Sequence, residues 1–232
     1  MKGGIGEVAL SPDGSQIAVS RNLAGETQVW VEQLSTGALS RLSFDVVTAD
    51  RPVWTPDGHR VAFLASKGNN RRVAWMRRFD GSDSLQRASP GDTKLDEITF
   101  DPLGRYLVLR TEGSGPGSRQ LLIVEIGKDT MPRTLIASKF DQYAPAISPD
   151  GKWLAYVSEE SGAPEVYVRP FPNVDSARFA VSVGGGSEPR WSRSGTELFF
   201  RNSRGAMLVA PITAGRTFDH GTPKVLFTAP GL

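Results

Sequence analysis

Charged side chains recur at one position of a repeated turn, and this recurrence is the clearest indication of chemistry in the chain. Seven residues before the glycine that closes each turn stand Glu7, Arg51, Glu97, Ala144 and Glu188. Asp50 and Asp96 directly precede two of them. Several carboxylates held at one level of a structure can bind a cation or a basic group of a peptide. We therefore predict a ligand-binding site, at the mouth of a channel, made of Glu7, Asp50, Arg51, Asp96, Glu97 and Glu188. The alternative is that these charges are solvated and bind no ligand.

Residues suited to catalysis are scarce. The chain has no cysteine and only two histidines, His59 and His220, both in turn-like segments where we expect peripheral side chains. A serine nucleophile needs a histidine base beside it, and no Gly-x-Ser-x-Gly, kinase or phosphate-loop motif is present. The glycine-rich segment 113–118 lacks the lysine of a phosphate loop and predicts a hairpin loop. We expect no catalytic residue, no metal site and no cofactor, so that this chain by itself is not an enzyme.

Composition limits the classes of partner. The 232 residues include 27 basic and 25 acidic side chains, interspersed along the chain, with a net charge of +2. Without a basic stripe, nucleic acid is not an expected partner. No apolar stretch is long enough to span a bilayer, and residues 1–4 begin no signal sequence, so we expect no insertion into a membrane. No linker-like segment divides the chain, and residues 1–232 are predicted to form a single domain.

The turn itself is repeated five times. Its forms are Ser11–Gly14, Thr55–Gly58, Asp101–Gly104, Ser148–Gly151 and Ser192–Gly195. The glycines at 14, 58, 104, 151 and 195 are separated by 44, 46, 47 and 44 residues. That period is typical of four-stranded propeller blades and longer than that of helix-pair repeats. Proline, aspartate and glycine in this order favour a tight turn between antiparallel strands, so each tetrad is predicted to be the tip of a hairpin.

Each repeat contains four segments with the patterns of strands. A large apolar residue precedes every tip, and we predict that it lies in the core: Leu10, Trp54, Phe100, Ile147 and Trp191. A continuous apolar run follows the tip, as in a strand covered on both faces. A third, more alternating segment and a short fourth segment complete the repeat. The blades are expected at 5–44, 49–89, 96–138, 143–182 and 187–228.

Such sheets cannot bury both faces alone, but radial stacking around an axis covers them. The predicted fold is therefore all-β, a β-propeller of four-stranded antiparallel blades with five repeats in this chain. The first and last strands belong to different repeats, so no strand exchange closes the ring. Two alternatives stay open: a closed five-bladed ring, or part of a larger propeller.

Two segments resemble a known family. Ala144-Pro-Ala-Ile-Ser-Pro-Asp-Gly-Lys-Trp-Leu-Ala-Tyr-Val-Ser158, with Glu165-Val-Tyr-Val-Arg-Pro-Phe-Pro172, resembles the TolB-like, WD-repeat-like β-propellers, as does Gly184-Gly-Gly-Ser-Glu-Pro-Arg-Trp191. The likeness is greatest to the C-terminal propellers of bacterial serine/threonine protein kinases, and it covers nearly the whole chain. It implies a non-catalytic module for sensing or for binding a protein or peptide, within a larger signalling protein.

The same resemblance suggests an extracytoplasmic, periplasmic domain of a membrane-anchored protein. The alternative function is the substrate-gating propeller of a prolyl-oligopeptidase-like serine peptidase.

Overall fold

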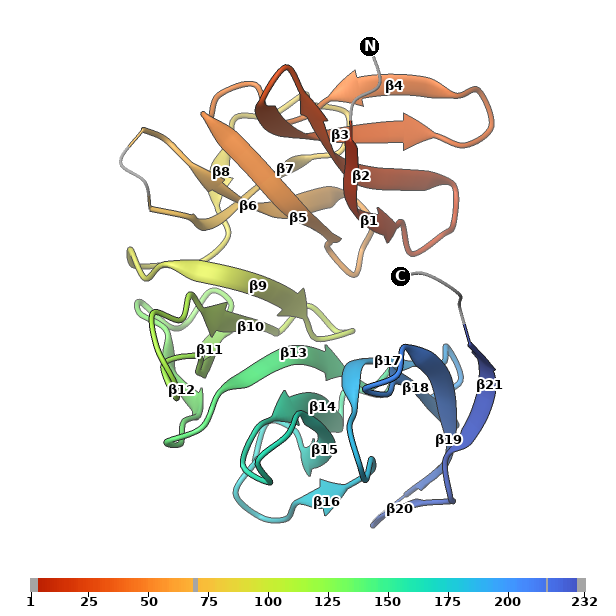
Figure 1. Ribbon diagram of the computed structural model, residues 1–232. Coiled ribbons are helices and arrows are strands. Elements are labelled where there is room, and N and C mark those ends of the chain that lie inside the picture. The colour runs from red at the N-terminus through yellow and green to blue at the C-terminus, as the bar shows by residue number, and fades with distance from the viewer. Residues whose placement is uncertain (1–3, 69–70, 216, 229–232) are drawn as a thin grey trace. The chain divides into compact units, whose positions relative to one another are not determined.

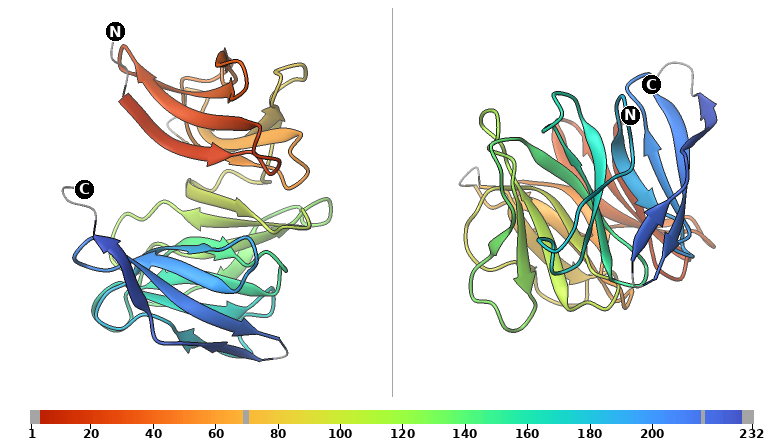
Figure 2. Two further views of the ribbon diagram at one scale, coloured as in Figure 1. Left: turned by 90° about the vertical axis from the view of Figure 1, so that its right-hand side faces the viewer. Right: turned by 90° about the horizontal axis from the view of Figure 1, so that it is seen from below.

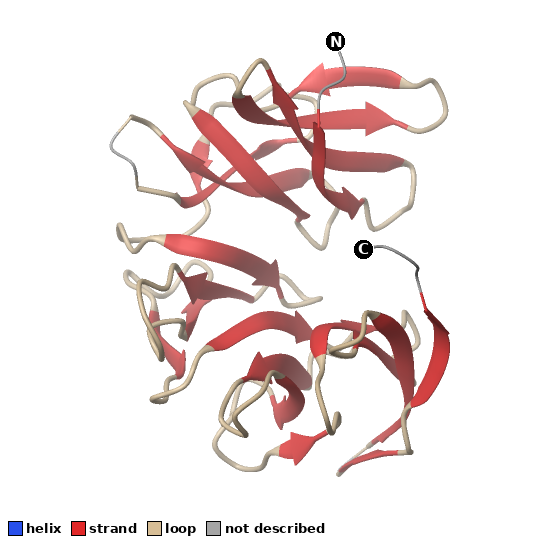
Figure 3. Cartoon of the chain, in the orientation of Figure 1, coloured by secondary structure: helices blue, strands red, loops and turns tan. Residues whose placement is uncertain are grey.

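Strands and loops make up the described part of the protein. The computed structural model describes residues 4–68, 71–215 and 217–228, so the predictions about residues 1–3 and 229–232 lie outside it. Figure 3 shows strands joined by loops, and the described residues contain no helix, hence none that could cross a membrane. The predicted all-β class is confirmed.

Contacts within the chain group it into two compact units. One unit comprises Met1–Thr111 and Val124–Arg133, and the other comprises Glu112–Ile123 and Thr134–Leu232. The first sheet contains β1 (Gly4–Leu10), β2 (Gln16–Leu23), β3 (Glu26–Gln33) and β4 (Ala38–Arg41). The second sheet contains β5 (Thr48–Trp54), β6 (Arg60–Ser66), β7 (Val73–Arg78) and β8 (Gln86–Arg87). In both sheets the strands lie side by side in chain order (Figure 1).

Three further sheets continue the pattern. The third contains β9 (Leu95–Phe100), β10 (Tyr106–Thr111), β11 (Leu121–Glu125) and β12 (Arg133–Ile136). The fourth contains β13 (Gln142–Ile147), β14 (Trp153–Ser158), β15 (Glu165–Pro170) and β16 (Phe179–Ala180). The fifth contains β17 (Ser187–Trp191), β18 (Glu197–Arg201), β19 (Ala206–Ala214), β20 (Phe218–His220) and β21 (Lys224–Thr228). Five repeats of antiparallel strands in chain order confirm the predicted blade pattern.

The fifth sheet differs from the prediction in one respect. β19 is long enough to pair with two short strands, its second half with β20 and its first half with β21 (Figure 2, blue). The sequence predicted a single short fourth strand in this blade, whereas the structure has two. His220, predicted to lie in a turn, is instead the last residue of β20, where its ring contacts Phe218. His59 does lie exposed in a turn, with its amide bonded to Asp57.

Side-chain hydrogen bonds explain why the repeated tetrad forms a tip. Ser11 Oγ donates to Asp13 Oδ1 at 2.6 Å and accepts from the amide of Gln16 at 2.9 Å. The same serine or threonine to aspartate bond occurs in the second and fourth tips, also at 2.6 Å. Gly58 has φ +70°, and a Cβ built on it would lie 3.6 Å from Pro12 Cδ of the preceding tip. Neighbouring tips within the first unit therefore pack against each other.

Within each unit a core lies between consecutive sheets, and one hydrogen bond recurs there. Trp54, just before the second tip, donates from Nε1 to the Ala9 carbonyl of the first sheet at 2.9 Å. Trp191 makes the equivalent bond from the fifth sheet to Ala146 of the fourth at 3.0 Å. Trp54 is 6% exposed, as the core prediction requires, but Leu10 is 50% exposed. The prediction is wrong for Leu10, because among the described residues of the first unit no other sheet covers its face in the way the first sheet covers Trp54.

Candidate functional site

Each predicted site position lies at or beside a β-bulge, where the pairing between the first and second strands of its repeat is interrupted. The register shifts between Ile5 and Val8, Asp50 and Val53, Leu95 and Glu97, Tyr143 and Ala146, and Ser187 and Arg190. At three of the recurring positions the backbone is left-handed: Arg51 has φ 51°, Ala144 52° and Glu188 53°. This conformation costs a non-glycine residue about 1–2 kcal/mol. β-Bulges commonly redirect side chains near functional sites, which makes this strained position a candidate.

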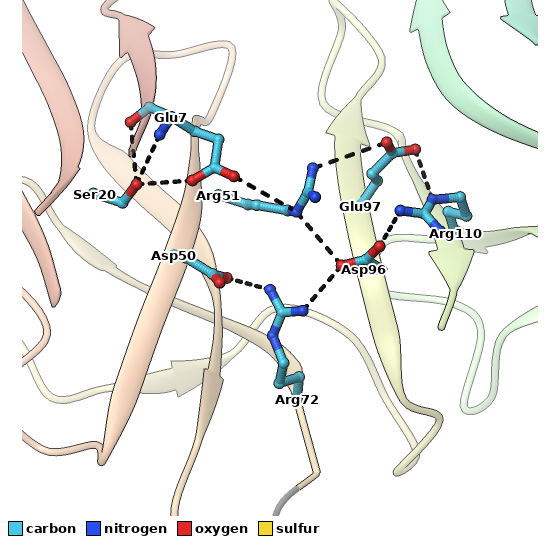
Figure 4. Close-up of polar contacts among 8 residues, drawn as sticks. All are labelled: Glu7, Ser20, Asp50, Arg51, Arg72, Asp96, Glu97 and Arg110. Atoms are coloured by element: carbon cyan, nitrogen blue, oxygen red, sulfur yellow. Dashed lines mark hydrogen bonds and ion pairs between the residues drawn. The ribbon is translucent and has the colours of Figure 1, made fainter. Parts of the chain in front are cut away.

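Five of the six predicted residues come together in the first unit. Figure 4 shows Glu7, Asp50, Arg51, Asp96 and Glu97 side by side, from β1, β5 and β9. Glu188 belongs to the other unit, where its carboxylate lies 3.5 Å from Arg201 Nη1. An open hollow of about 520 Å³ lies beside Glu188 and is lined by polar residues.

Two arginines that the sequence did not identify hold the carboxylates of the first unit (Figure 4). Arg72, just before β7, donates to Asp50 and, at 2.9 Å, to Asp96 Oδ1. Arg110 on β10 is buried; its Nη2 bonds Asp96, and its Nε lies 2.9 Å from Glu97 Oε2. Asp50, Asp96 and Glu97 are thus fixed by direct contacts.

Arg51 is held differently from these two arginines. Its Nε lies 3.5 Å from Asp96 Oδ1 and 3.9 Å from Glu7 Oε1, and its Nη1 lies 3.9 Å from Glu97 Oε1. These distances exceed those of direct hydrogen bonds, which are about 2.7–3.2 Å. Its side chain is also 33% exposed. Four carboxylates and three guanidinium groups give the cluster a formal charge of −1, which becomes −2 if Arg51 moves away.

Glu7 is oriented by the second strand. Ser20 Oγ donates to Glu7 Oε2 at 2.8 Å and accepts from the Glu7 amide at 2.8 Å. A Cβ on the preceding Gly6 would lie 2.5 Å from Ser20 Oγ, so glycine is required for this approach. Burial acts to raise the pKa of Glu7, but the Ser20 hydrogen bond and the charge of Arg51 outweigh it and lower the pKa below its ordinary value.

The two aspartates titrate in opposite directions. Burial acts to raise the pKa of Asp96, but the positive charges of Arg110 and Arg51 outweigh it, so the pKa is lowered. Burial raises the pKa of Asp50 above its ordinary value, since Arg72 only partly compensates and the charge of Glu7 adds to the effect. Asp96 therefore stays ionised to lower pH than Asp50.

A pairing rule within the repeats could have located one of the missed arginines. Six residues after the tip glycine stand Ser20, Arg110 and Arg201, each in contact with the glutamate that lies seven residues before the same glycine. Arg110 and Glu97 are also direct cross-strand partners. Arg72 follows no such spacing, and no sequence signal indicates it.

The arrangement is suited to binding and offers little for catalysis. Neither His59 nor His220 is among the residues of the cluster, and the cluster contains no cysteine. Among the described residues no group of three or more His, Asp and Glu side chains is placed to hold a metal ion. Fixed carboxylates around a partly exposed guanidinium are suited to exchanging one positively charged group for another.

Comparison with known proteins places this fold. No family model matches the chain. It is 27% identical to a TolB homolog of Chlorobium luteolum over 156 residues, which cover 67% of this chain and 34% of that protein. It is 26% identical to the uncharacterized peptidase YuxL of Bacillus subtilis over 147 residues, which cover 63% of this chain and 20% of that protein. The matched part thus spans between a fifth and about a third of these curated relatives.

A solved structure agrees with the sequence relatives. The crystal structure of TolB from Acinetobacter baumannii superposes with a TM-score of 0.72 and 20% identity, covering 96% of this chain and 55% of that one. The chain is a β-propeller, and its fold is that of the TolB-like propellers. The predicted resemblance to TolB-like propellers is confirmed, whereas the finer resemblance to kinase propellers stays a prediction.

Proposed function

We propose that this chain is a non-catalytic binding module that holds a positively charged group of a protein or peptide among Glu7, Asp50, Asp96 and Glu97. The observation that carries the proposal is the contrast between the arginines: Arg72 and Arg110 fix the carboxylates directly, whereas Arg51 lies 3.5–3.9 Å from them. Arg51 occupies the place that a lysine, arginine or amino terminus of a ligand takes in the complex.

Exchange of Arg51 for a ligand group costs little. Ion pairs of this exposure contribute about 0–1 kcal/mol each. The carboxylates do not move when Arg51 leaves, because Arg72, Arg110 and Ser20 keep their bonds to them. A preorganised acceptor of this kind needs little ordering on binding. The resemblance to TolB-like propellers implies a module that binds a protein or peptide, which supports this class of partner.

The test is a selection of short random peptides displayed on phage, followed by fluorescence anisotropy with the enriched peptides. We expect enrichment in lysine and arginine. Glu97→Lys should weaken binding by at least about tenfold, because it places like charges opposite each other. Arg51→Ala should strengthen binding several-fold, because the competing guanidinium is gone.

Glu197→Lys is the matched control, since Glu197 is an exposed carboxylate on β18 of the other unit. It makes the same charge change and should leave affinity unaltered, and circular dichroism melting checks that all variants fold. Enrichment of acidic peptides, or affinities indifferent to both Glu97→Lys and Arg51→Ala, would contradict the proposal.

The proposal further makes this chain one part of a larger bacterial signalling protein, such as a kinase with an extracytoplasmic propeller. Its support is the sequence resemblance and the small share of the curated relatives that the chain matches. The complete reading frame tests it: a kinase domain and a membrane helix ahead of residue 1 are expected, and a frame without either counts against it.

A second candidate function is the substrate-gating propeller of a serine peptidase. The similarity to YuxL, whose name describes an uncharacterized peptidase, favours it. A Gly-x-Ser-x-Gly domain in the same reading frame would support this function, and hydrolysis of fluorogenic peptides by the complete protein would establish it. Lack of such a domain would eliminate it.

A further inference from the structure

The positively charged side chains of the cluster drawn in Figure 4 are all arginines. Arg72 shows how one guanidinium joins two carboxylates, since its Nη2 bonds Asp50 of β5 and its Nη1 donates to Asp96 Oδ1 of β9 at 2.9 Å. Arg110 also reaches two carboxylates: its Nη2 bonds Asp96, and its Nε lies 2.9 Å from Glu97 Oε2. A guanidinium is planar and presents several donors in fixed directions, which suits it to joining carboxylates in this way.

Arg51 marks a third place of the same shape. Its Nε faces Asp96 Oδ1 at 3.5 Å and Glu7 Oε1 at 3.9 Å, whereas its Nη1 faces Glu97 Oε1 at 3.9 Å. The three oxygens therefore lie around two different nitrogens, and they come from both β1 and β9. An ammonium is a compact charge with all its donors on one atom, so it matches this arrangement less well than a planar fork does.

The second oxygen of each glutamate is held by the protein itself. Ser20 Oγ donates to Glu7 Oε2 at 2.8 Å, and Arg110 Nε lies 2.9 Å from Glu97 Oε2. Each glutamate therefore turns its Oε1 toward Arg51 (Figure 4). Because the directions of these acceptors are fixed, the place selects for the directions of the incoming donors as well as for their charge.

Partial burial of the carboxylates favours the same chemical group. The side chains of Asp96 and Glu97 are 24% and 21% exposed, and that of Arg51 is 33% exposed. A ligand cation that enters this place must lose part of its hydration shell. An ammonium is more strongly hydrated than a guanidinium, so its entry costs more free energy.

We infer that the cluster selects an arginine side chain of its protein or peptide partner over a lysine side chain or an amino terminus. This inference rests on the proposed function, because it identifies the chemical group that replaces Arg51. The ligand guanidinium contacts Glu7 Oε1 and Glu97 Oε1, which Arg51 approaches only to 3.9 Å. Binding thereby joins β1 of the first sheet to β9 of the third.

NMR titration of the Arg51→Ala chain with small probes tests this selection. The probes are N-acetyl-arginine amide, N-acetyl-lysine amide and N-acetyl-citrulline amide, of which citrulline has nearly the shape of arginine but no charge. Followed at the amides of Glu7 and Glu97, the dissociation constant should be lower for arginine than for lysine by about tenfold or more, the effect of one additional charge-assisted hydrogen bond. Citrulline should give no saturable shift. The wild-type chain should rank the probes in the same order with lower affinities, and circular dichroism verifies that the variant folds.

Two glutamate variants locate the selection. Glu97→Gln removes one of the two charged acceptors and should abolish the preference for arginine over lysine. Glu197→Gln is the matched control on β18 of the other unit and should leave the preference unchanged. A probe with two methyl groups on the terminal nitrogens of arginine keeps its charge but loses bidentate hydrogen bonding, so it should bind no better than lysine.

The probes separate this inference from the proposed function. Equal affinities for arginine and lysine, with citrulline silent, overturn the inference and leave the proposed function standing. Equal affinities for arginine and citrulline overturn both. A preference for arginine that survives Glu97→Gln also overturns the inference, since the guanidinium would then be recognised elsewhere.

Discussion

The hydrogen bond from the Trp54 indole to the first sheet contributes to the stability of the interface between consecutive blades, and a substitution that removes its N–H donor measures that contribution. Trp54 is 6% exposed and donates from Nε1 to the Ala9 carbonyl at 2.9 Å. Trp54→Phe keeps an aromatic ring but removes the donor. The lost bond costs about 0.5–1.5 kcal/mol, and a carbonyl left unpaired in the interface raises the cost toward about 2 kcal/mol. Trp54→Ala also removes the ring and should cost about 3–5 kcal/mol.

Trp30 provides the matched control. Its Nε1 is buried and has no hydrogen-bond partner among the described residues. Trp30→Phe removes a buried donor that has no partner, which favours folding, and it also removes ring volume, which disfavours folding. Because the two effects offset each other, the free energy of unfolding should change by less than about 0.5–1 kcal/mol. Urea unfolding followed by circular dichroism measures both variants without relying on tryptophan fluorescence. Equal destabilisation by Trp54→Phe and Trp30→Phe would refute the assigned role of the Ala9 bond.

Four further predictions concern the first unit. Gly58→Ala should cost about 1–2 kcal/mol in urea unfolding, since φ is +70° there and alanine disfavours it. Arg77→Ala should cost about 1–3 kcal/mol by the same assay, because it leaves the Leu42 carbonyl without its buried guanidinium donor. Asp13 should titrate by NMR with a pKa of about 2, because Ser11 and the Ser15 amide bond its charged form, and Ser11→Ala should raise that pKa toward 3.8. The fold lowers the pKa of Asp96 below its ordinary value of 3.8. The ionised carboxylate therefore stabilises the folded state above pH 3.8, and this stabilisation is lost as the pH falls through the folded pKa. In Asp96→Asn the free energy of unfolding should depend less on pH in that range.

The fold was predictable because its determinants are local and repeated. Tip residues such as Ser11, Asp13 and Gly14 form their turn through bonds within a few residues, so spacing alone locates the hairpins. The exposure of Leu10 could not be predicted in this way. It has the sequence context of Trp54, but within the first unit another sheet covers Trp54 and no described sheet covers Leu10.

The site was predictable only in part, for a similar reason. The offset of seven residues from the tip glycine identifies the bulge position, because a bulge keeps its place in a repeated hairpin. The offset of six residues after the glycine would have identified Ser20 and Arg110. Arg72 escapes both rules, because it contacts Asp50 of β5 and Asp96 of the next sheet from a segment ahead of a third strand.

Arg51 differs from Arg72 and Arg110 because its guanidinium lies 3.5–3.9 Å from the carboxylates of the cluster. Where glutamate occupies the bulge, the residue six positions after the tip glycine binds it within the same repeat. In the second repeat that residue is Leu64, which is buried and apolar, so it offers Arg51 no polar partner. The guanidinium turns instead to Glu7 of the first sheet and to Asp96 and Glu97 of the third. A charge shared among three sheets, and held by none at hydrogen-bond distance, is the one that an incoming cation displaces at the least cost.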